Sequence, residues 1–272
     1  MSTHVATDSL VEDLASRLDA AAMTRTACAQ LSQSHKISLD TAYAVQRAVA
    51  GRRLARCEHP LGIKLGFTSR TKAAQMGVSE VIIGRLTSGM LVADGGEINL
   101  GDYIHPRAEP ELAFRLSRDL APGEWNGQAT DIVDAVAPAM EIIDSRFRDF
   151  RFDLADVVAD NTSASGAVIG AWRPIGEGLD NRGVLFETDG RIVGAGSTAA
   201  ILGDPLRAVT AAVRMAARYQ ITLSAGTVLL AGAATPAVAL RAGTAVSTSV
   251  SGLGRVRFTV AGSDSLAGAN DE

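Results

Sequence analysis

The sequence lacks several features that would assign it to a common enzyme class. It holds two cysteines, Cys28 and Cys57, which form neither a disulfide framework nor a metal-binding pair. Its four histidines show no zinc spacing. There is no Walker loop and no Gly-x-Ser-x-Gly elbow. The sequence therefore gives no support to a zinc enzyme, a P-loop NTPase or an α/β-type serine hydrolase.

Charge and hydropathy exclude further classes of partner. The net charge is -4 and the pI is near 5.6, so no basic surface for nucleic acid is expected. No apolar run reaches the length of about eighteen residues that a membrane helix requires. Residues 1–13 lack the basic and apolar regions of a secretory signal. We therefore expect a cytoplasmic protein with no membrane span and no nucleic-acid partner.

The pattern of apolar residues changes near residue 60. Residues 8–58 show helical spacing, and a helix is predicted from Leu39 to Cys57 with Ser38 before it. From Ile63 onward, short β-rich runs are separated by Gly, Asp and Pro, and Asp189-Gly190 predicts a hairpin. Only a few helices are expected after that point, at about 69–76, 129–133 and 205–219.

These patterns predict an α+β fold with a mixed, largely antiparallel sheet core, since regular βαβ alternation is missing. We expect an N-terminal helical region at 1–60 packed on the core. A catalytic mixed β domain would follow at 61–262. The small, polar residues 263–272 predict a frayed tail.

Three glutamates form a candidate metal site. Glu109 and Glu111 lie in a segment that alternates like a strand, so both project from one side. Glu141 lies in an apolar run, where a carboxylate is costly to bury unless it is paired or binds a cation. Together they offer oxygen ligands for Mg²⁺ or Mn²⁺. A solvated strand face for the first two and a salt bridge for Glu141 remain open alternatives.

Three residues near these glutamates in the sequence have predictions of their own. Pro110 has no N–H, which suits a strand start or edge where both carboxylates face an open cleft. Asp144 is expected to point away from Glu141 and to pair with Arg146 or Arg148. His105 is expected to be an ordinary loop histidine.

Lys64 and a polar stretch at 158–166 are candidates for binding substrate. Beside a metal site, the Lys64 ammonium would bind a carboxylate or donate a proton, although a surface lysine is the alternative. The stretch from Val158 to Gly166 offers backbone N–H groups and hydroxyls that suit an oxyanion or carboxylate, with an ordinary turn as the alternative.

Read together, these segments resemble the hydratase/decarboxylase branch of the fumarylacetoacetate hydrolase superfamily. The resemblance spans about residues 40 to 260. It rests on five motifs in order: Gly62-Ile-Lys64-Leu-Gly66-Phe-Thr68, Ala74-Gln-Met-Gly77-Val, Pro106-Arg-Ala-Glu109-Pro-Glu111-Leu-Ala-Phe, Glu141-Ile-Ile-Asp144-Ser-Arg146 and Val158-Ala-Asp160-Asn161-Thr-Ser163.

The resemblance implies a β-roll that binds Mg²⁺ (or Mn²⁺) through Glu109, Glu111 and Glu141. It also implies that Lys64 lies beside the substrate and takes part in catalysis together with Glu109. These roles are expectations from the family.

The resemblance also implies a site for an organic acid. Asn161, Ser163 and Ser165 would hold the substrate's carboxylate. By a separate hypothesis on the mechanism, Ile82, Ile83 and Leu86 would supply an apolar setting for the carboxylate that leaves, because tight solvation of that group opposes decarboxylation.

The activity implied is decarboxylation of 2-oxo-3-hexenedioate to 2-hydroxypenta-2,4-dienoate in meta-cleavage aromatic catabolism, with hydration of that dienoate as the alternative. Hydratases of the branch typically carry Pro-Asp-x-Gly where this chain has Val81-Ile82-Ile83-Gly84, which favours decarboxylation. The expected partners are a small 2-oxo or 2-hydroxy dienoic acid, further copies of the chain in a homo-oligomer, and the companion pathway enzyme. A non-catalytic partner subunit is a third hypothesis, and three converging carboxylates argue against it.

Overall fold

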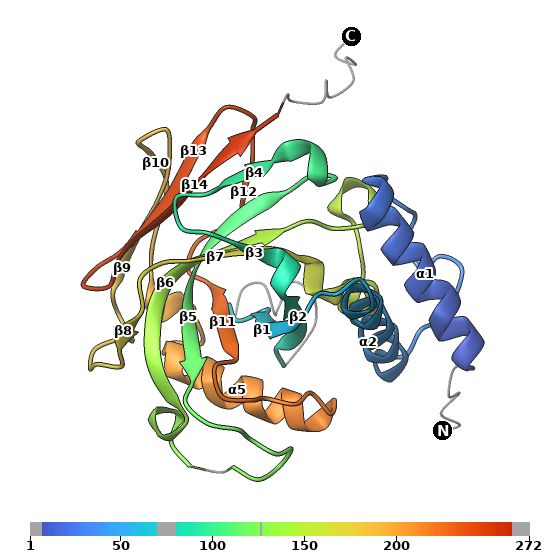
Figure 1. The fold of residues 1–272 in the computed structure, drawn as a ribbon, viewed down its shortest axis with the longest axis horizontal. Helices are drawn as coiled ribbons and strands as arrows, with labels where there is room; N and C mark the ends of the chain where they lie inside the picture. The colour runs from blue at the N-terminus through green and yellow to red at the C-terminus, as the bar shows by residue number, and fades with distance from the viewer. Residues whose placement is uncertain (1–6, 70–79, 126, 263–272) are drawn as a thin grey trace.

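The computed structural model describes residues 7–69, 80–125 and 127–262, in which a few helices accompany many short strands (Figure 1). The helices are α1 (Asp8–Thr24), α2 (Leu39–Ala55), α4 (Leu154–Ala159) and α5 (Pro205–Arg218). The strands are β1 (Pro60–Gly66), β2 (Ile82–Thr87), β3 (Leu91–Val92), β4 (Glu97–Asn99), β5 (Arg107–Leu116), β6 (Val133–Ile143), β7 (Ala164–Ile169), β8 (Arg173–Pro174), β9 (Gly183–Thr188), β10 (Arg191–Ser197), β11 (Val228–Ala233), β12 (Val238–Ala239), β13 (Ala245–Val250) and β14 (Gly254–Ala261). The helix expected at 69–76, apart from Ser69, the motif at 74–78 and the expected tail lie outside the described residues.

The strands of the described ranges form two curled sheets. The larger runs β2-β1-β11-β5-β6-β7-β3, with β12 added to β5 and β8 to β6. The smaller runs β10-β9-β13-β14-β4. Only the pairs β1–β11, β3–β7 and β4–β14 are parallel. The prediction of a mixed, largely antiparallel sheet core is confirmed.

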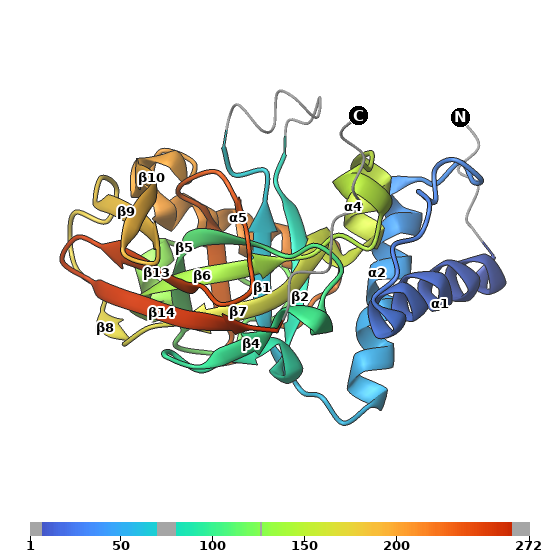
Figure 2. The ribbon, with the colours of Figure 1, turned by 90° about the horizontal axis from the view of Figure 1, so that it is seen from above.

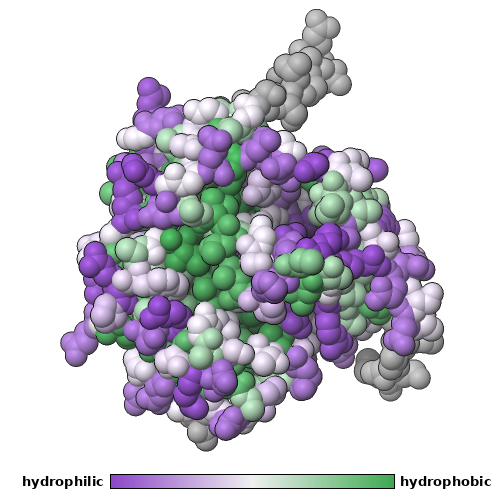
Figure 3. Space-filling view, in the orientation of Figure 1, coloured by the Kyte–Doolittle hydropathy of each residue, from purple (hydrophilic) through white to green (hydrophobic). Residues whose placement is uncertain are grey.

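The central strands β5 and β6 are buried on both faces. On the outer face, Leu112 and Phe114 share a core with the apolar side of α5. Further along the same face, Met140 and Ile142 pack against Phe186 and the rest of the smaller sheet. Figure 3 shows apolar atoms gathered in a band over the middle of the molecule. Core packing fills the outer face of β5 and β6, so a functional site on these strands would lie on the inner face of the roll.

The N-terminal helices lie at one end of the molecule, with the strands at the other (Figure 2). Apolar side chains of both helices, such as Leu14 and Val45, share a core with Ile83 of the sheet. Helix α2 begins as predicted, because the Ser38 hydroxyl accepts a hydrogen bond from Thr41 N at 3.1 Å. No helix in the described ranges is long and apolar enough to cross a membrane.

The local predictions succeed where turn chemistry is decisive. Asp189 and Gly190 have φ angles of 49° and 73° and join β9 to β10, as the predicted hairpin requires.

The helix predicted at 129–133 is wrong. A single 3-10 turn covers Ala129–Asp131, and Val133 already pairs with Leu116 of β5. Tertiary pairing with a long central strand outweighs the local preference.

Pro110 does not lie at an edge or a strand start, which corrects the sequence prediction. It lies inside β5 and opposite Met140 of β6. On the other side of β5, Glu111 pairs with β11 and Ala108 pairs with β12, so Pro110 falls at the change of partner. Its carbonyl oxygen accepts a hydrogen bond from Ala234 N on that side. The missing N–H therefore interrupts no regular ladder.

Candidate metal centre

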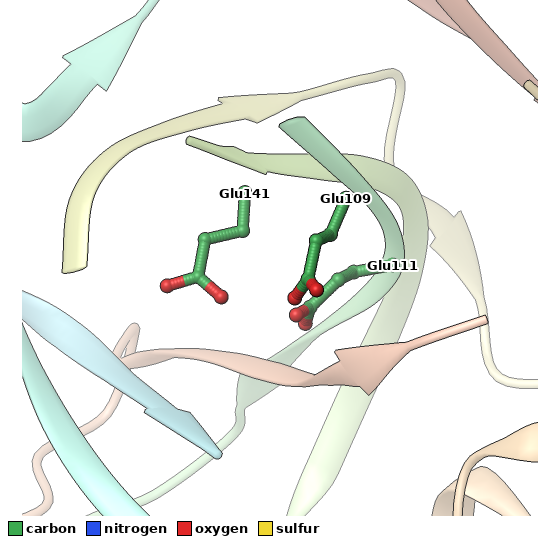
Figure 4. Close-up of side chains that lie close together, drawn as sticks. All are labelled: Glu109, Glu111 and Glu141. Carbon is green, nitrogen blue, oxygen red and sulfur yellow. The ribbon is translucent and has the colours of Figure 1, made fainter. Parts of the chain in front are cut away.

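The three glutamates predicted as metal ligands meet on the inner face of the roll. Glu109 and Glu111 project from β5, and Glu141 projects from β6 directly opposite Glu109 in the ladder. Figure 4 shows the carboxylates of Glu109 and Glu111 close together, with that of Glu141 reaching toward them. Like charges directly opposite each other destabilise a sheet, so this register favours a bound cation.

The geometry suits one divalent ion. One carboxylate oxygen from each of the three glutamates lies within 4.8 Å of the others. For Mg²⁺ with bonds of about 2.1 Å, ligand oxygens lie at most about 4.2 Å apart, so small side-chain movements would complete the site. The three residues are 7%, 2% and 0% exposed for Glu109, Glu111 and Glu141. The solvated strand face and the open cleft considered from the sequence are therefore wrong.

Several carboxylate oxygens at this site lack hydrogen bonds. Glu111 Oε2 accepts a bond from Gly232 N at 2.7 Å, but within the described ranges Glu111 Oε1 accepts none. The same is true of Glu141 Oε1, while Glu141 Oε2 has Lys64 Nζ at 3.0 Å as an ion pair. Buried oxygens without partners are costly, and a cation would satisfy them. The donor set therefore fits a hard divalent ion that prefers oxygen.

Lys64 is buried beside the carboxylates. The residue is 3% exposed, so the surface alternative is wrong. The parallel pairing of β1 with β11 places Lys64 next to Leu230, on the same face as the glutamates. Its ammonium donates a hydrogen bond to the Thr162 carbonyl oxygen at 3.0 Å and pairs with Glu141. Among the described residues, Lys64 thus places a positive charge beside this carboxylate cluster.

Burial and the neighbouring charges raise the pKa values of two of these glutamates. Burial raises the pKa of Glu141 to about 7, against the lowering effect of Lys64 and with a further rise from Glu109. Burial, and next the charge of Glu141, raise the pKa of Glu111 well above its ordinary value of 4.5. Both shifts mean that the metal-free site holds protons which a cation would displace.

The stretch predicted to bind a carboxylate is a left-handed turn. Asn161, Thr162 and Ser163 have φ angles of 52°, 56° and 59°. Non-glycine residues adopt this conformation at a cost of roughly 1–2 kcal/mol each, and such strain gathers at functional sites. The turn aims the Thr162 carbonyl oxygen at Lys64, so it positions the ammonium.

The predicted substrate residues of this turn differ in what they contact. The Asn161 side chain bonds both the N–H and the carbonyl oxygen of Arg85, each at 2.8 Å, and so ties the turn to β2. Ser165 Oγ accepts a bond from the Arg146 guanidinium. Ser163 Oγ is buried and has no hydrogen-bond partner in the described part of the chain. Of the three, Ser163 has the side chain left for a ligand.

The two isoleucines predicted to line the substrate pocket lie on opposite faces of β2. Ile82 pairs with Gly66 and shares the face of Lys64. Ile83 pairs with Leu65 and points into the core between the sheet and the helices. Strand alternation therefore directs Ile83 away from the metal centre, which corrects its place in the predicted pocket.

Asp144 and Arg146 do not pair through their side chains, contrary to expectation. Asp144 accepts hydrogen bonds from Ile104 N and His105 N at 2.8 Å each. Arg146 instead forms a buried ion pair with Asp160, next to the left-handed turn. Ion pairs between distant segments leave no periodic signal, so the sequence pattern could not identify this one.

The Gly232 N–H at Glu111 and the Thr162 carbonyl oxygen at Lys64 were also missed from the sequence. Main-chain contacts carry no residue signature. Gly232 does leave a trace, since it has φ of 113° and a Cβ there would lie 2.1 Å from Thr68 Oγ1. Only glycine fits that position.

Comparison with known proteins agrees with this geometry. The family model described as fumarylacetoacetate hydrolase C-terminal matches residues 66–261. A 4-oxalocrotonate decarboxylase from Pseudomonas sp is 48% identical over 252 residues, covering 93% of this chain and 98% of the relative. A 2-keto-4-pentenoate hydratase from Paraburkholderia xenovorans is 36% identical over 224 residues, covering 81% of this chain and 83% of the relative.

A solved structure matches almost the whole chain. The 4-oxalocrotonate decarboxylase from Pseudomonas putida G7, complexed with magnesium and adipate, superposes with a TM-score of 0.90 at 32% identity. The match covers 95% of this chain and 100% of that one. The chain therefore belongs to the fumarylacetoacetate hydrolase family. Within it, the chain is an enzyme of the hydratase/decarboxylase branch, to which its relatives' names point.

Proposed function

We propose that this protein is a metal-dependent lyase that removes CO₂ from 2-oxo-3-hexenedioate, also called 4-oxalocrotonate. The observation that carries the proposal is the convergence of three buried carboxylates beside a buried lysine, with unsatisfied oxygens on Glu111 and Glu141. The 48% identity to a 4-oxalocrotonate decarboxylase supports the choice of reaction. Mg²⁺ is the proposed ion, since a relative's structure is complexed with magnesium.

Glu109, Glu111 and Glu141 would hold the ion. When bound, the ion supplies Lewis-acid chemistry toward the 1-carboxylate and the 2-oxo oxygen of the substrate. The reaction breaks the C5–C6 bond, and its electron pair moves through the alkene toward the 2-oxo oxygen. Lys64 lies where its ammonium can orient the 1-carboxylate or deliver the proton that completes the dienol. Ser163 Oγ, which has no hydrogen-bond partner among the described residues, would bind a substrate oxygen.

The wall next to the carboxylates favours loss of CO₂. The inner face of the sheet continues from Glu111 through Ala139 to Ala113, Ala137 and Leu230, all apolar and buried. A carboxylate placed against such a wall is poorly solvated, and its conversion to neutral CO₂ is favoured. Ile82 extends the apolar surface near Lys64.

Hydration of 2-hydroxypenta-2,4-dienoate is the second candidate, because hydratases are among the relatives at 36% identity. A hydratase needs a group that activates or delivers water. On β2 beside Lys64 this chain has Ile82 and Gly84, and no acid lies at either position. We therefore propose decarboxylation in preference to hydration.

A product assay tests the choice between decarboxylation and hydration. The enzyme with Mg²⁺ is expected to release CO₂ from 2-oxo-3-hexenedioate, and a chelator should stop the release. A parallel assay on 2-hydroxypenta-2,4-dienoate measures hydration, and Mn²⁺ replaces Mg²⁺ in a further set. Rapid hydration without CO₂ release from the first substrate would overturn the proposal. A homo-oligomer, a companion enzyme and a cytoplasmic location stay predictions.

The effect of Mg²⁺ on thermal stability is expected to grow with pH. The raised pKa of Glu141 gives the metal-free fold stability that is fully present below about pH 4.5 and is lost as pH rises through about 7. The raised pKa of Glu111 acts in the same direction. Ligands must lose their protons to bind the ion, so Mg²⁺ restores more stability at pH 8 than at pH 5.5. Melting temperatures with and without MgCl₂ across this range measure the effect.

Proton release provides the control for this prediction. Titration calorimetry in buffers of different ionisation enthalpy should detect protons released when Mg²⁺ binds near pH 7. A shift in melting temperature that is the same at pH 5.5 and pH 8 would contradict the assignment of the ligands.

A further inference from the structure

A second cavity lies away from the metal centre, between α2, the ends of β1 and β2, and the segment that leads into β11. It has a volume of about 750 Å³, which is in the usual range for a small-molecule site. Its lining includes Arg47 of α2 and Arg85 of β2. Arg85 pairs with Ile63 in the ladder, so its side chain leaves the opposite face of the sheet from Lys64.

Arg85 is a half-buried cation that forms no ion pair with any residue the structure describes. Its main chain is bonded to Asn161, but within the described residues its Nε is buried without a hydrogen-bond partner. Burial and the neighbouring charge of Arg47 both lower the pKa of Arg85. No carboxylate of the described ranges forms an ion pair with either guanidinium, whereas nearby Arg53 is paired with Glu58.

Like charges that line one cavity repel each other, and an anion bound between them would relieve this repulsion. A guanidinium presents a planar fork of donors that matches a carboxylate, and two such forks favour one anionic group. The rest of the lining includes the apolar side chains Leu54, Leu61 and Ile221. An anion with a hydrocarbon body fits this combination better than an inorganic ion.

We propose that this cavity is a binding site for a small organic carboxylate, separate from the metal centre. The carboxylate would bridge Arg47 and Arg85, and its hydrocarbon chain would lie on the apolar wall. The metal centre is on the other face of the β1–β2 pair, so occupation of one site does not require the other.

Hexanoate is a suitable probe, with hexanol as its uncharged counterpart. Calorimetry on the Mg²⁺-loaded full chain should detect saturable binding of hexanoate and much weaker binding of hexanol. Arg85→Gln and Arg47→Gln should each weaken hexanoate binding by about 10-fold or more, as expected when a charge-assisted hydrogen bond is lost. Arg241→Gln, at an exposed position that lines a different cavity, should bind hexanoate as the wild type does.

A crystal soaked with 6-bromohexanoate locates the ligand through the anomalous signal of bromine. A peak in the cavity beside Arg85 supports the proposal. Bromine at the metal centre alone, equal binding of hexanol, or unchanged binding in Arg47→Gln overturns it. Arg47 is exposed on α2, so its substitution should leave the fold intact and keeps the test valid if Arg85→Gln unfolds.

Discussion

Glu111→Gln is expected to abolish measurable Mg²⁺ binding and to lower kcat by about 10³-fold or more. The substitution keeps the size of the side chain and an oxygen for Gly232 N, but it removes the negative charge from the ligand set. Loss of a Lewis acid that contributes several kcal/mol to the transition state corresponds to a factor of this order. Calorimetric titration with Mg²⁺ and the rate of CO₂ release measure the two effects.

At alkaline pH, where Glu111 of the metal-free wild type loses its proton, the metal-free variant should be more stable than the wild type. Burial and the charges of Glu141 and Glu109 oppose ionisation of Glu111, so an uncharged side chain relieves repulsion. Glu124→Gln, in an exposed loop, is the matched control and should change neither property. Wild-type turnover by Glu111→Gln at saturating Mg²⁺ would show that the carboxylate cluster is not the metal centre.

Lys64→Ala is expected to lower kcat by about 10²-fold or more if the ammonium moves a proton in the reaction. The side chain is buried between Glu141 and the Thr162 carbonyl oxygen, so no other cation among the described residues takes its place there. Steady-state kinetics at saturating Mg²⁺ separate kcat from KM. A change confined to KM would mean that Lys64 only binds substrate, equally in ground and transition states.

Lys64→Arg tests whether a positive charge at this position is sufficient for turnover. Arginine keeps the positive charge but is larger, and it does not give up its proton. Gly84 packs closely against Lys64, since a Cβ on Gly84 would lie 3.0 Å from the Lys64 side chain. Recovery of KM without recovery of kcat would support proton transfer by the lysine.

Much of the candidate site was predictable because carboxylates are costly to bury. Glu141 within an apolar run needed a partner, and strand alternation placed Glu109 beside Glu111. The resemblance to the family then added Lys64 to the predicted site. Ile83 was misplaced because adjacent strand residues point to opposite faces, and a motif alone does not say which face meets the site.

The predicted fold class rested on turn residues and short β-rich runs, which are local properties. The roles of Asn161 and Arg146 were not predictable, because each side chain bonds a segment far away in the chain. Pro110 shows the same limit. Its tolerance inside a central strand depends on the change from β11 to β12 beside it.

By itself, the sequence determined the chemistry of this protein: the oxygen ligands, the lysine, the helical start and the strand-rich remainder. Those features follow from side-chain type and short-range periodicity. Only the tertiary structure shows that Glu141 lies opposite Glu109, that the parallel pairing of β1 with β11 places Lys64 beside them, and that Arg47 and Arg85 line the same separate cavity. Register and long-range pairing depend on how whole faces are buried, and no local stretch of sequence contains that information.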